Sequence, residues 1–345
     1  MSLRSEILDQ PAVLARLLAT RMDEVRRIVQ EIARREIEFV LLAARGTSDN
    51  AGLYAKYLWG IENHIPVALA APSMFGVYRS PPRLRRALVV GISQSGESPD
   101  IVNVVQEGRR QGAATLAITN DAGSSLAHAA DHVIFTDTGT EQSVAATKTY
   151  TAELMAIAMI SIAWRGVSQS LGELERVPDL VSRALGMEPI VEQAATSYRE
   201  MTKCVVLGRG YNYATAHEWA LKLTELAYVV ALPYSSADFL HGPVAMLDRG
   251  FPVLVVAPEA AVLKDLLPVL RELGQSRGTD LLAISNHPEV LQLASTPLAM
   301  PTEIPEWLSP LVDIVPAQLF CLHLGAQKGL DVEHPRGLQK VTKTW

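Results

Sequence analysis

Apolar residues follow two different spacings along this chain of 345 residues. Over residues 5–35 they recur every three or four positions, which predicts an amphipathic helical segment with Pro11 near a helix start. Further on, continuous apolar runs alternate with helical patterns, and the clearest runs are residues 37–44, 88–92, 115–119 and 132–135. Continuous apolar strands that alternate with helices are typical of buried parallel strands, so the pattern predicts an α/β layered fold.

The second half of the chain repeats the first. Three segments recur in order at an offset of 164 to 166 positions: 41–46 in 205–210, 89–90 in 255–256, and 117–120 in 283–286. This repetition predicts two copies of one α/β domain, and the period is far too long for a solenoid. We expect a helical arm over 1–35, domains over 36–178 and 179–325, and a tail over 326–345, with a linker near 166–196 that has few strand features.

Composition narrows the possible functions. The net charge of -6 and the pI of about 5.8 argue against a broad basic surface for nucleic acid. Both cysteines, Cys204 and Cys321, lie in apolar runs and indicate a reducing compartment, and no ligand spacing suggests a metal site. The first ten residues lack a signal-peptide pattern, and the apolar stretch 154–164 is too short to span a bilayer. We therefore expect a cytoplasmic protein that needs no cofactor and binds neither nucleic acid nor membrane.

A serine-rich segment follows one of the predicted strands. Ser93, Gln94, Ser95, Gly96 and Ser98 precede a helical pattern that begins at Pro99. A helix N-terminus at the carboxyl end of a parallel strand favours anions, because free N–H groups and the helix dipole point at the ligand. The segment predicts a phosphate site, to which Ser48 could add a hydroxyl. Glu97 would repel a dianion, so we expect its side chain to point away.

The corresponding segment of the second half, 256–259, has no serine cluster, which predicts one phosphate site per chain. The alternative interpretation of the serine-rich segment 93–98 is a strand-to-helix turn that binds no ligand and in which Ser98 only caps the helix.

Candidate proton-transfer groups lie in the second half. Glu218, Lys222 and Glu225 share one face of a predicted helix, although spacing alone fits a solvated, salt-bridged face better. His241 lies in a predicted loop, and Lys340 lies in a tail without apolar periodicity. A carboxylate, an amine and an imidazole are the groups that move protons between a carbonyl carbon and its neighbour.

Several motifs together resemble a known family. They are residues 93–98, 139–141 with 144–148, 220–225, 240–243 and 335–340, and they resemble the isomerase half of glucosamine-6-phosphate synthase. The resemblance implies two tandem sugar-isomerase (SIS) domains, each a flavodoxin-like parallel sheet with helices on both faces, and a homodimer with shared active sites.

The resemblance also implies roles for single residues. Phosphate and sugar contacts fall on Ser48, Ser93, Gln94, Ser95 and Ser98, with Val144 and Ala145 beside the sugar. Glu225 resembles the base that shuttles a proton between carbons 1 and 2, and Lys222 resembles its partner. His241 resembles a ring-opening histidine that the neighbouring subunit supplies, and Lys340 resembles the lysine that meets the open-chain carbonyl.

Departures from the synthase favour a different reaction. Thr224 stands in place of a lysine, Ala146 stands in place of a serine, and about forty residues precede the first predicted strand, too few for a glutaminase domain. These features are closer to stand-alone SIS-type glucosamine-6-phosphate deaminases, which release ammonia and fructose 6-phosphate. The alternatives are an aldose–ketose isomerase, a fructosamine-phosphate deglycase and a non-catalytic sugar phosphate regulator. The tail is expected to be mobile until ligand binds.

Overall fold

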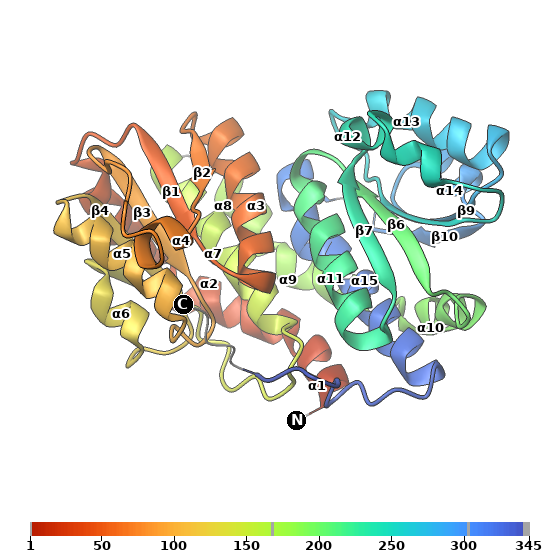
Figure 1. Cartoon of the computed structure of the whole chain (residues 1–345), viewed down its shortest axis with the longest axis horizontal. Coiled ribbons are helices and arrows are strands. Elements are labelled where there is room, and N and C mark those ends of the chain that lie inside the picture. Colours follow the sequence, from red (N-terminus) through yellow and green to blue (C-terminus); the bar gives the residue numbers. More distant parts are fainter. Residues whose placement is uncertain (1, 167–168, 302–303, 341–345) are drawn as a thin grey trace. The chain divides into compact units, whose positions relative to one another are not determined.

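The computed structural model describes residues 2–166, 169–301 and 304–340. The chain divides into two compact units, each built on a five-stranded sheet (Figure 1). The N-terminal unit holds Asp9–Gln142, Ala146–Arg176 and the tail residues Gln339 and Lys340. The C-terminal unit holds the first eight residues, Ser143–Ala145 and Val177–Leu338.

The sheet of the N-terminal unit is parallel throughout, with strand order β2-β1-β3-β4-β5. Its strands are β1 (Phe39–Ala43), β2 (Val67–Leu69), β3 (Ala87–Ile92), β4 (Ala114–Thr119) and β5 (His132–Phe135). Its helices are α2 (Gln10–Ala33), α3 (Gly46–Glu62), α4 (Ser73–Gly76), α5 (Pro99–Arg110), α6 (Ser125–Ala129), α7 (Lys148–Arg165) and α8 (Gln169–Glu175). Every residue of β3 and β4 is buried, as expected for strands with helices on both faces.

The C-terminal unit has the same topology in its own sheet, with order β10-β9-β8-β6-β7 and parallel pairing. Its strands are β6 (Lys203–Gly208), β7 (Val230–Ser235), β8 (Pro252–Val256), β9 (Asp280–Ser285) and β10 (Thr296–Ala299). Its helices include α1 (Leu3–Leu8), α9 (Val177–Leu185), α10 (Glu188–Ser197), α11 (Tyr213–Ala227), α12 (Ser236–Leu240), α13 (Leu263–Arg271), α14 (Pro288–Leu293) and α15 (Ser309–Gln327). Read from its other edge, this order matches that of the N-terminal unit strand for strand, so the predicted duplication and fold class are confirmed.

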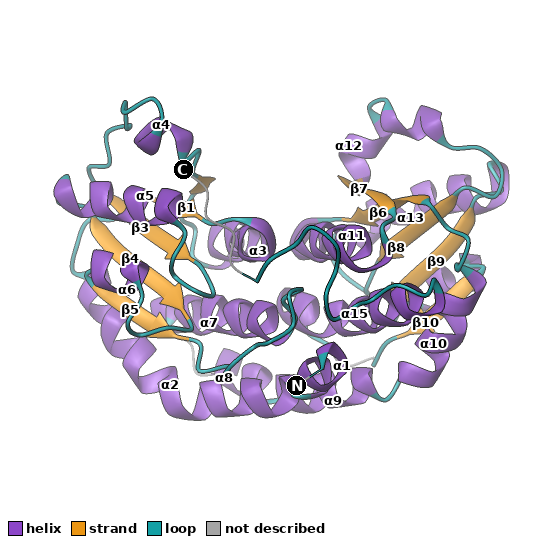
Figure 2. Cartoon of the chain, turned by 60° about the horizontal axis from the view of Figure 1, so that its bottom comes forward, coloured by secondary structure: helices purple, strands orange, loops and turns teal. Residues whose placement is uncertain are grey.

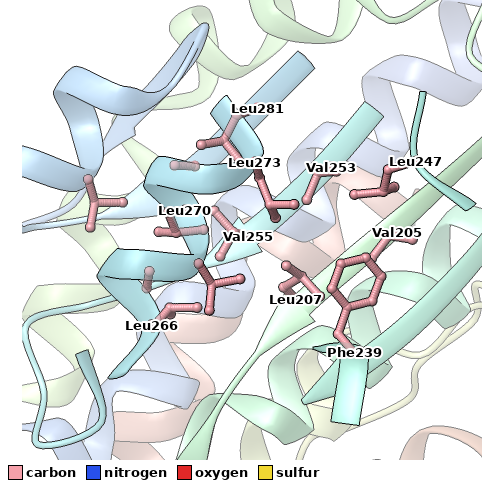
Figure 3. Packing of buried hydrophobic residues seen from close by; sticks show 14 of the residues in the cluster. Val205, Leu207, Phe239, Leu247, Val253, Val255, Leu266, Leu270, Leu273 and Leu281 are labelled. Atoms are coloured by element: carbon pink, nitrogen blue, oxygen red, sulfur yellow. The ribbon is translucent and has the colours of Figure 1, made fainter. Parts of the chain in front are cut away.

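Helices cover both faces of each sheet (Figure 2). In the N-terminal unit, α5 and α6 pack on one face, while α2, α3 and α7 form the layer on the other. Figure 3 shows the core of the C-terminal unit, a buried cluster that contains Val205, Val253 and Leu281 of neighbouring strands and Leu266 and Leu270 of α13. Burial of these branched side chains is the main favourable term in forming the layers.

The segment predicted as a linker is helical instead. It forms α8, α9 and α10, and the last two pack on α15. Pro178 and Pro189, which indicated a linker, are each the second residue of a helix, where a missing N–H costs nothing. The domain boundaries 36–178 and 179–325 stay predictions.

One helical stretch of the described chain has the length and apolar composition of a membrane span. It covers Glu306–Gln327, and 94% of its most apolar window is buried inside the protein. Within the C-terminal unit it packs against α9, α10 and α11, which is the position of a central core helix.

Candidate active site

Two helices begin side by side at the switch point of the N-terminal sheet. β1 and β3 are neighbouring strands, and α3 and α5 start at their carboxyl ends. Arg45, just before α3, binds the buried carboxylate of Asp100 in the first turn of α5 at 2.8 Å. Ligands of open α/β sheets bind at such a point, where the strand order reverses.

The serine-rich segment forms the loop between β3 and α5. The Ser93 hydroxyl accepts a hydrogen bond from the Gly96 N–H at 3.1 Å, and the Ser95 hydroxyl accepts one from the Glu97 N–H at 3.3 Å. Ser98 is the N-cap residue of α5, yet its hydroxyl makes no capping hydrogen bond within the described chain. The alternative in which Ser98 only caps the helix therefore lacks support, and its hydroxyl can serve a ligand.

Gly96 is required by the shape of this loop. Its φ is +64°, and a Cβ at this position would lie 2.2 Å from the Ser124 hydroxyl oxygen. Glu97 turns to the neighbouring helix, where its carboxylate accepts hydrogen bonds from the N–H and hydroxyl of Ser125 at 2.8 and 3.0 Å. Its carboxylate is thus bonded to Ser125, although Glu97 also lines the cavity that Ser95 lines, so its pointing away from a bound phosphate stays a prediction.

A cavity of about 950 Å³ opens beside the loop, within the N-terminal unit. Gln94 and Ser95 line it together with Arg16, Glu141 and Lys340. The Lys340 ammonium lies 2.9 Å from Oε2 of Glu141, whose side chain is fully buried. The structure therefore brings the tail lysine and the phosphate loop to one cavity, whose volume suits a small-molecule ligand.

The tail is anchored at more than one point, in contrast to the loose segment that its composition suggests. α15 continues to Gln327, and the Arg336 N–H donates to the Tyr228 hydroxyl at 2.9 Å while its guanidinium lies over the same ring. Residues 341–345 lie outside the described chain.

The corresponding position of the C-terminal unit is closed. Arg209, Asn212 and Pro258 lie where the N-terminal unit has Arg45, Ser48 and its serine loop, and the space they line is only about 10 Å³. That volume holds about one water molecule. The difference supports one sugar phosphate site per chain.

The predicted proton-transfer group lies on α11 and is buried. Lys222 is 1% exposed, and its ammonium lies 2.5 Å from Oε2 of Glu225 and 3.4 Å from Oε1 of Glu218. Burial acts to lower the pKa of Lys222, but the attraction and hydrogen bonds of both carboxylates outweigh it and raise the pKa. The Glu225 side chain keeps 21% exposure, so a ligand can reach it. The alternative in which these residues form a solvated, salt-bridged helix face is therefore wrong for Lys222 and Glu218, which are buried.

The remaining predicted site residues are not drawn into this cluster. His241 is exposed on the turn after α12, and no hydrogen bond or ion pair joins it to Lys222 or Glu225 in the described chain. Val144 is half-buried and Ala145 is buried, in the short segment that belongs to the C-terminal unit. Among the residues that the structure describes, no group of three or more His, Cys, Asp or Glu side chains could hold a metal ion.

Three buried carboxylates lie next to predicted site residues but were assigned no role of their own from the sequence. Glu218 completes the Lys222 cluster, and its spacing was the available signal. Glu141 binds Lys340 and also accepts the N–H groups of Thr147 and Thr149 at the start of α7. Glu153 on α7 accepts the Ser48 hydroxyl at 2.8 Å, a contact across 105 residues that no local pattern indicates.

Comparison with known proteins identifies the family and agrees with the fold. A family model of the SIS domain matches residues 36–163 and 197–327. The isomerizing glutamine–fructose-6-phosphate aminotransferase of Methanothermobacter thermautotrophicus is 35% identical over 337 residues, which cover 97% of this chain and 56% of that protein. The chain thus spans little more than half the length of this curated relative.

Solved structures share the whole fold. The C-terminal domain of glucosamine-fructose-6-phosphate aminotransferase from Francisella tularensis has a TM-score of 0.87 at 28% identity, covering 96% of this chain and 98% of that one. A candidate phosphosugar isomerase from Silicibacter pomeroyi has a TM-score of 0.87 at 32% identity, covering 96% and 100%.

The fold and the serine loop define a phosphosugar-isomerase type of protein. The chain belongs to the SIS-domain family, with two SIS repeats, and is related to the isomerase half of the aminotransferase.

Proposed function

We propose that this protein converts glucosamine 6-phosphate and water into fructose 6-phosphate and ammonia, by proton transfer between carbons 1 and 2. The observation that carries the proposal is the buried lysine–glutamate pair on α11, with 2.5 Å between Lys222 and Glu225. A buried charge is costly unless it is used or paired, and this pair leaves one carboxylate partly exposed.

The serine loop binds the phosphate. Hydroxyls of Ser93, Ser95 and Ser98 provide donors for a dianion, and the dipole of α5 adds to them. Gln94 lies in the same cavity and contacts the sugar. The phosphate end therefore needs no lysine.

Glu225 transfers the proton. Lys222 binds Oε2, which leaves Oε1 to take the proton from carbon 2 of the open-chain amino sugar. The electron pair moves to the carbon 1 carbonyl oxygen, which is protonated, and an enolamine forms. Glu225 returns the proton to carbon 1, which gives an imine at carbon 2. Water adds to this imine, and ammonia leaves.

Lys340 assists at the carbonyl. Its ammonium donates to the carbon 1 oxygen as negative charge develops there. Glu141 holds this ammonium at the wall of the cavity before substrate arrives.

Two departures from the synthase pattern support release of ammonia over a transfer reaction. Thr224 places no charge beside Lys222, because its side chain is neutral, and its one hydroxyl proton has the carbonyl oxygens of Ala220 at 2.9 Å and Val229 at 3.2 Å as possible acceptors. Ala146 offers no hydroxyl to the sugar. The retained Glu225, Lys222 and Lys340 argue against a purely regulatory sugar phosphate receptor, and a cytoplasmic location stays a prediction.

The deciding experiment is incubation with glucosamine 6-phosphate, with ammonia and fructose 6-phosphate measured together. We expect the two products in equal amounts. Interconversion of glucose 6-phosphate and fructose 6-phosphate without ammonia would show an isomerase instead. Release of the substituting amine and a hexose 6-phosphate from N-substituted fructosamine phosphates, without ammonia from glucosamine 6-phosphate, would show a deglycase.

We also propose a homodimer in which His241 serves the neighbouring subunit's site and opens the sugar ring. The exposure of His241 on its turn supports this arrangement. A His241→Ala chain and a Glu225→Gln chain should each be nearly inactive. Their co-refolded mixture should recover up to about a quarter of wild-type activity, because about half of randomly paired dimers are mixed and one of the two sites in each has both residues intact. Mixed dimers verified by mass that show no recovery would mean that each site is built by one chain.

A further inference from the structure

Ser48 differs from the serines of the phosphate loop in what its hydroxyl already binds. It lies in the first turn of α3 and is 8% exposed, and its hydroxyl donates to Oε1 of Glu153 at 2.8 Å. Glu153 lies on α7 and is 1% exposed. A hydroxyl has one proton and two acceptor lone pairs, and a carboxylate accepts hydrogen bonds without donating any.

We infer that Glu153 is a positioning residue that fixes Ser48 as a hydrogen-bond acceptor toward the bound sugar. Because the only proton of Ser48 points to Glu153, the lone pairs of its oxygen are what a ligand meets. The inference deepens the proposed function and rests on it, since it concerns the same sugar phosphate.

The consequence is a selection rule for the ligand. The group that faces Ser48 must donate, so it is a sugar hydroxyl or the ammonium of the amino sugar. A phosphate dianion only accepts and would be repelled by a lone pair held in this way. Ser48 therefore accepts a hydrogen bond from the sugar, whereas Ser93, Ser95 and Ser98 bind the phosphate.

A purely structural tie between α3 and α7 does not require a carboxylate. The same two helices are already joined further along, where the Trp59 indole donates to the Ile157 carbonyl at 3.1 Å and Ser161 donates to Asn63 at 2.7 Å. These links use neutral groups only. A carboxylate buried at the N-terminal end of α3 costs free energy that a neutral tie avoids, and it lies beside the switch point.

Glu153→Gln tests the inference, because an amide can donate to Ser48 and so release the Ser48 proton toward the ligand. We expect the dissociation constant of glucosamine 6-phosphate to rise about tenfold, the loss of one hydrogen bond, while that of inorganic phosphate changes less than about twofold. Ser48→Ala should raise the dissociation constant of glucosamine 6-phosphate by a similar factor. The double variant should raise it no further than either single variant does. Ser161→Ala is the matched control on the same helix pair: it should lower stability without changing the ratio of the two constants.

A second measurement uses the wild-type protein and needs no substitution to fold. In a series of hexose 6-phosphates with one hydroxyl at a time replaced by fluorine, or the amino group by hydrogen, one position should weaken binding about tenfold, and this loss should vanish in Ser48→Ala. No sensitive position would overturn the inference.

Other outcomes separate this inference from the proposed function. Equal loss of inorganic phosphate and sugar phosphate in both variants would place Ser48 at the phosphate and overturn the inference alone. So would a loss in Ser48→Ala that Glu153→Gln does not share. Failure of the wild-type protein to bind any hexose 6-phosphate would overturn the proposed function and the inference with it.

Discussion

Replacing Asp313 by asparagine should change how the stability of the protein depends on pH. Asp313 lies on α15 and is fully buried, with Asn212 and Ser309 as its polar neighbours. Burial raises the pKa of Asp313 to about 8, and these two neutral side chains lower it only in part. The carboxyl group is therefore protonated in the folded protein at neutral pH.

The sign and size of the effect follow from proton linkage. An unfolded aspartate has a pKa of about 3.9, so between roughly pH 4 and pH 8 the folded state holds a proton that the unfolded state has lost. Within this window the free energy of unfolding falls as pH rises, by about 1.4 kcal/mol per pH unit for this one group. Above the folded pKa the two states bind equally few protons, and the dependence ends.

Asparagine keeps the size of the side chain and removes the titration. Urea unfolding of wild type and of Asp313→Asn at pH 5, 6, 7 and 8 gives the free energy of unfolding of each protein. Subtracting the two values at each pH cancels the contributions of the other titrating groups, which both proteins share. We expect the stability of the variant relative to wild type to grow by about 1.4 kcal/mol per pH unit from pH 5 toward pH 8. A difference that stays constant from pH 5 to pH 8 would refute the reasoning.

Three further predictions concern the site. Ser93→Ala combined with Ser95→Ala should raise the KM for glucosamine 6-phosphate more than tenfold, because a charged ligand loses two hydrogen bonds of about 1.5–3 kcal/mol each; an unchanged KM in steady-state assays would contradict the phosphate assignment. Glu225→Gln should lower kcat at least about a hundredfold and abolish exchange of the carbon-bound proton with deuterium from solvent; exchange at the wild-type rate would mean that Glu225 is not the base. Lys340→Met should lower kcat with little change in sugar phosphate affinity measured by calorimetry, and Glu141→Gln should lower it in the same direction by a smaller factor. Full ammonia release by Lys340→Met would exclude the lysine from the chemistry.

The sequence predicted those strands best that are buried on both faces. β3, β4 and β9 read as continuous apolar runs because helices cover them on each side. The edge strand β7 escaped prediction, since it contains Pro233 and exposes Val230, and neither is typical of a central strand. Proline likewise misled the interpretation of residues 166–196, because a proline in the first turn of a helix and a proline in a linker look the same in sequence.

The candidate site was predictable where the chemistry is local. Serines that follow a strand and precede Pro99 identify a helix N-terminus from neighbouring residues alone. The burial of Lys222 was not predictable, because Glu218, Lys222 and Glu225 have the spacing of an ordinary surface helix. Glu218 and Lys222 are buried because α11 packs against α15 and against β6 and β7, which its own sequence does not indicate.

The closed position in the C-terminal unit has a consequence for how ligand titrations are read. Two homologous domains suggest two equivalents of ligand per chain, with cooperativity between them. A space of about 10 Å³ cannot admit a hexose phosphate, so calorimetry should give a stoichiometry of one per chain and a simple hyperbolic isotherm for each site. Any sigmoidal response would then report communication between copies of the chain rather than between its two repeats.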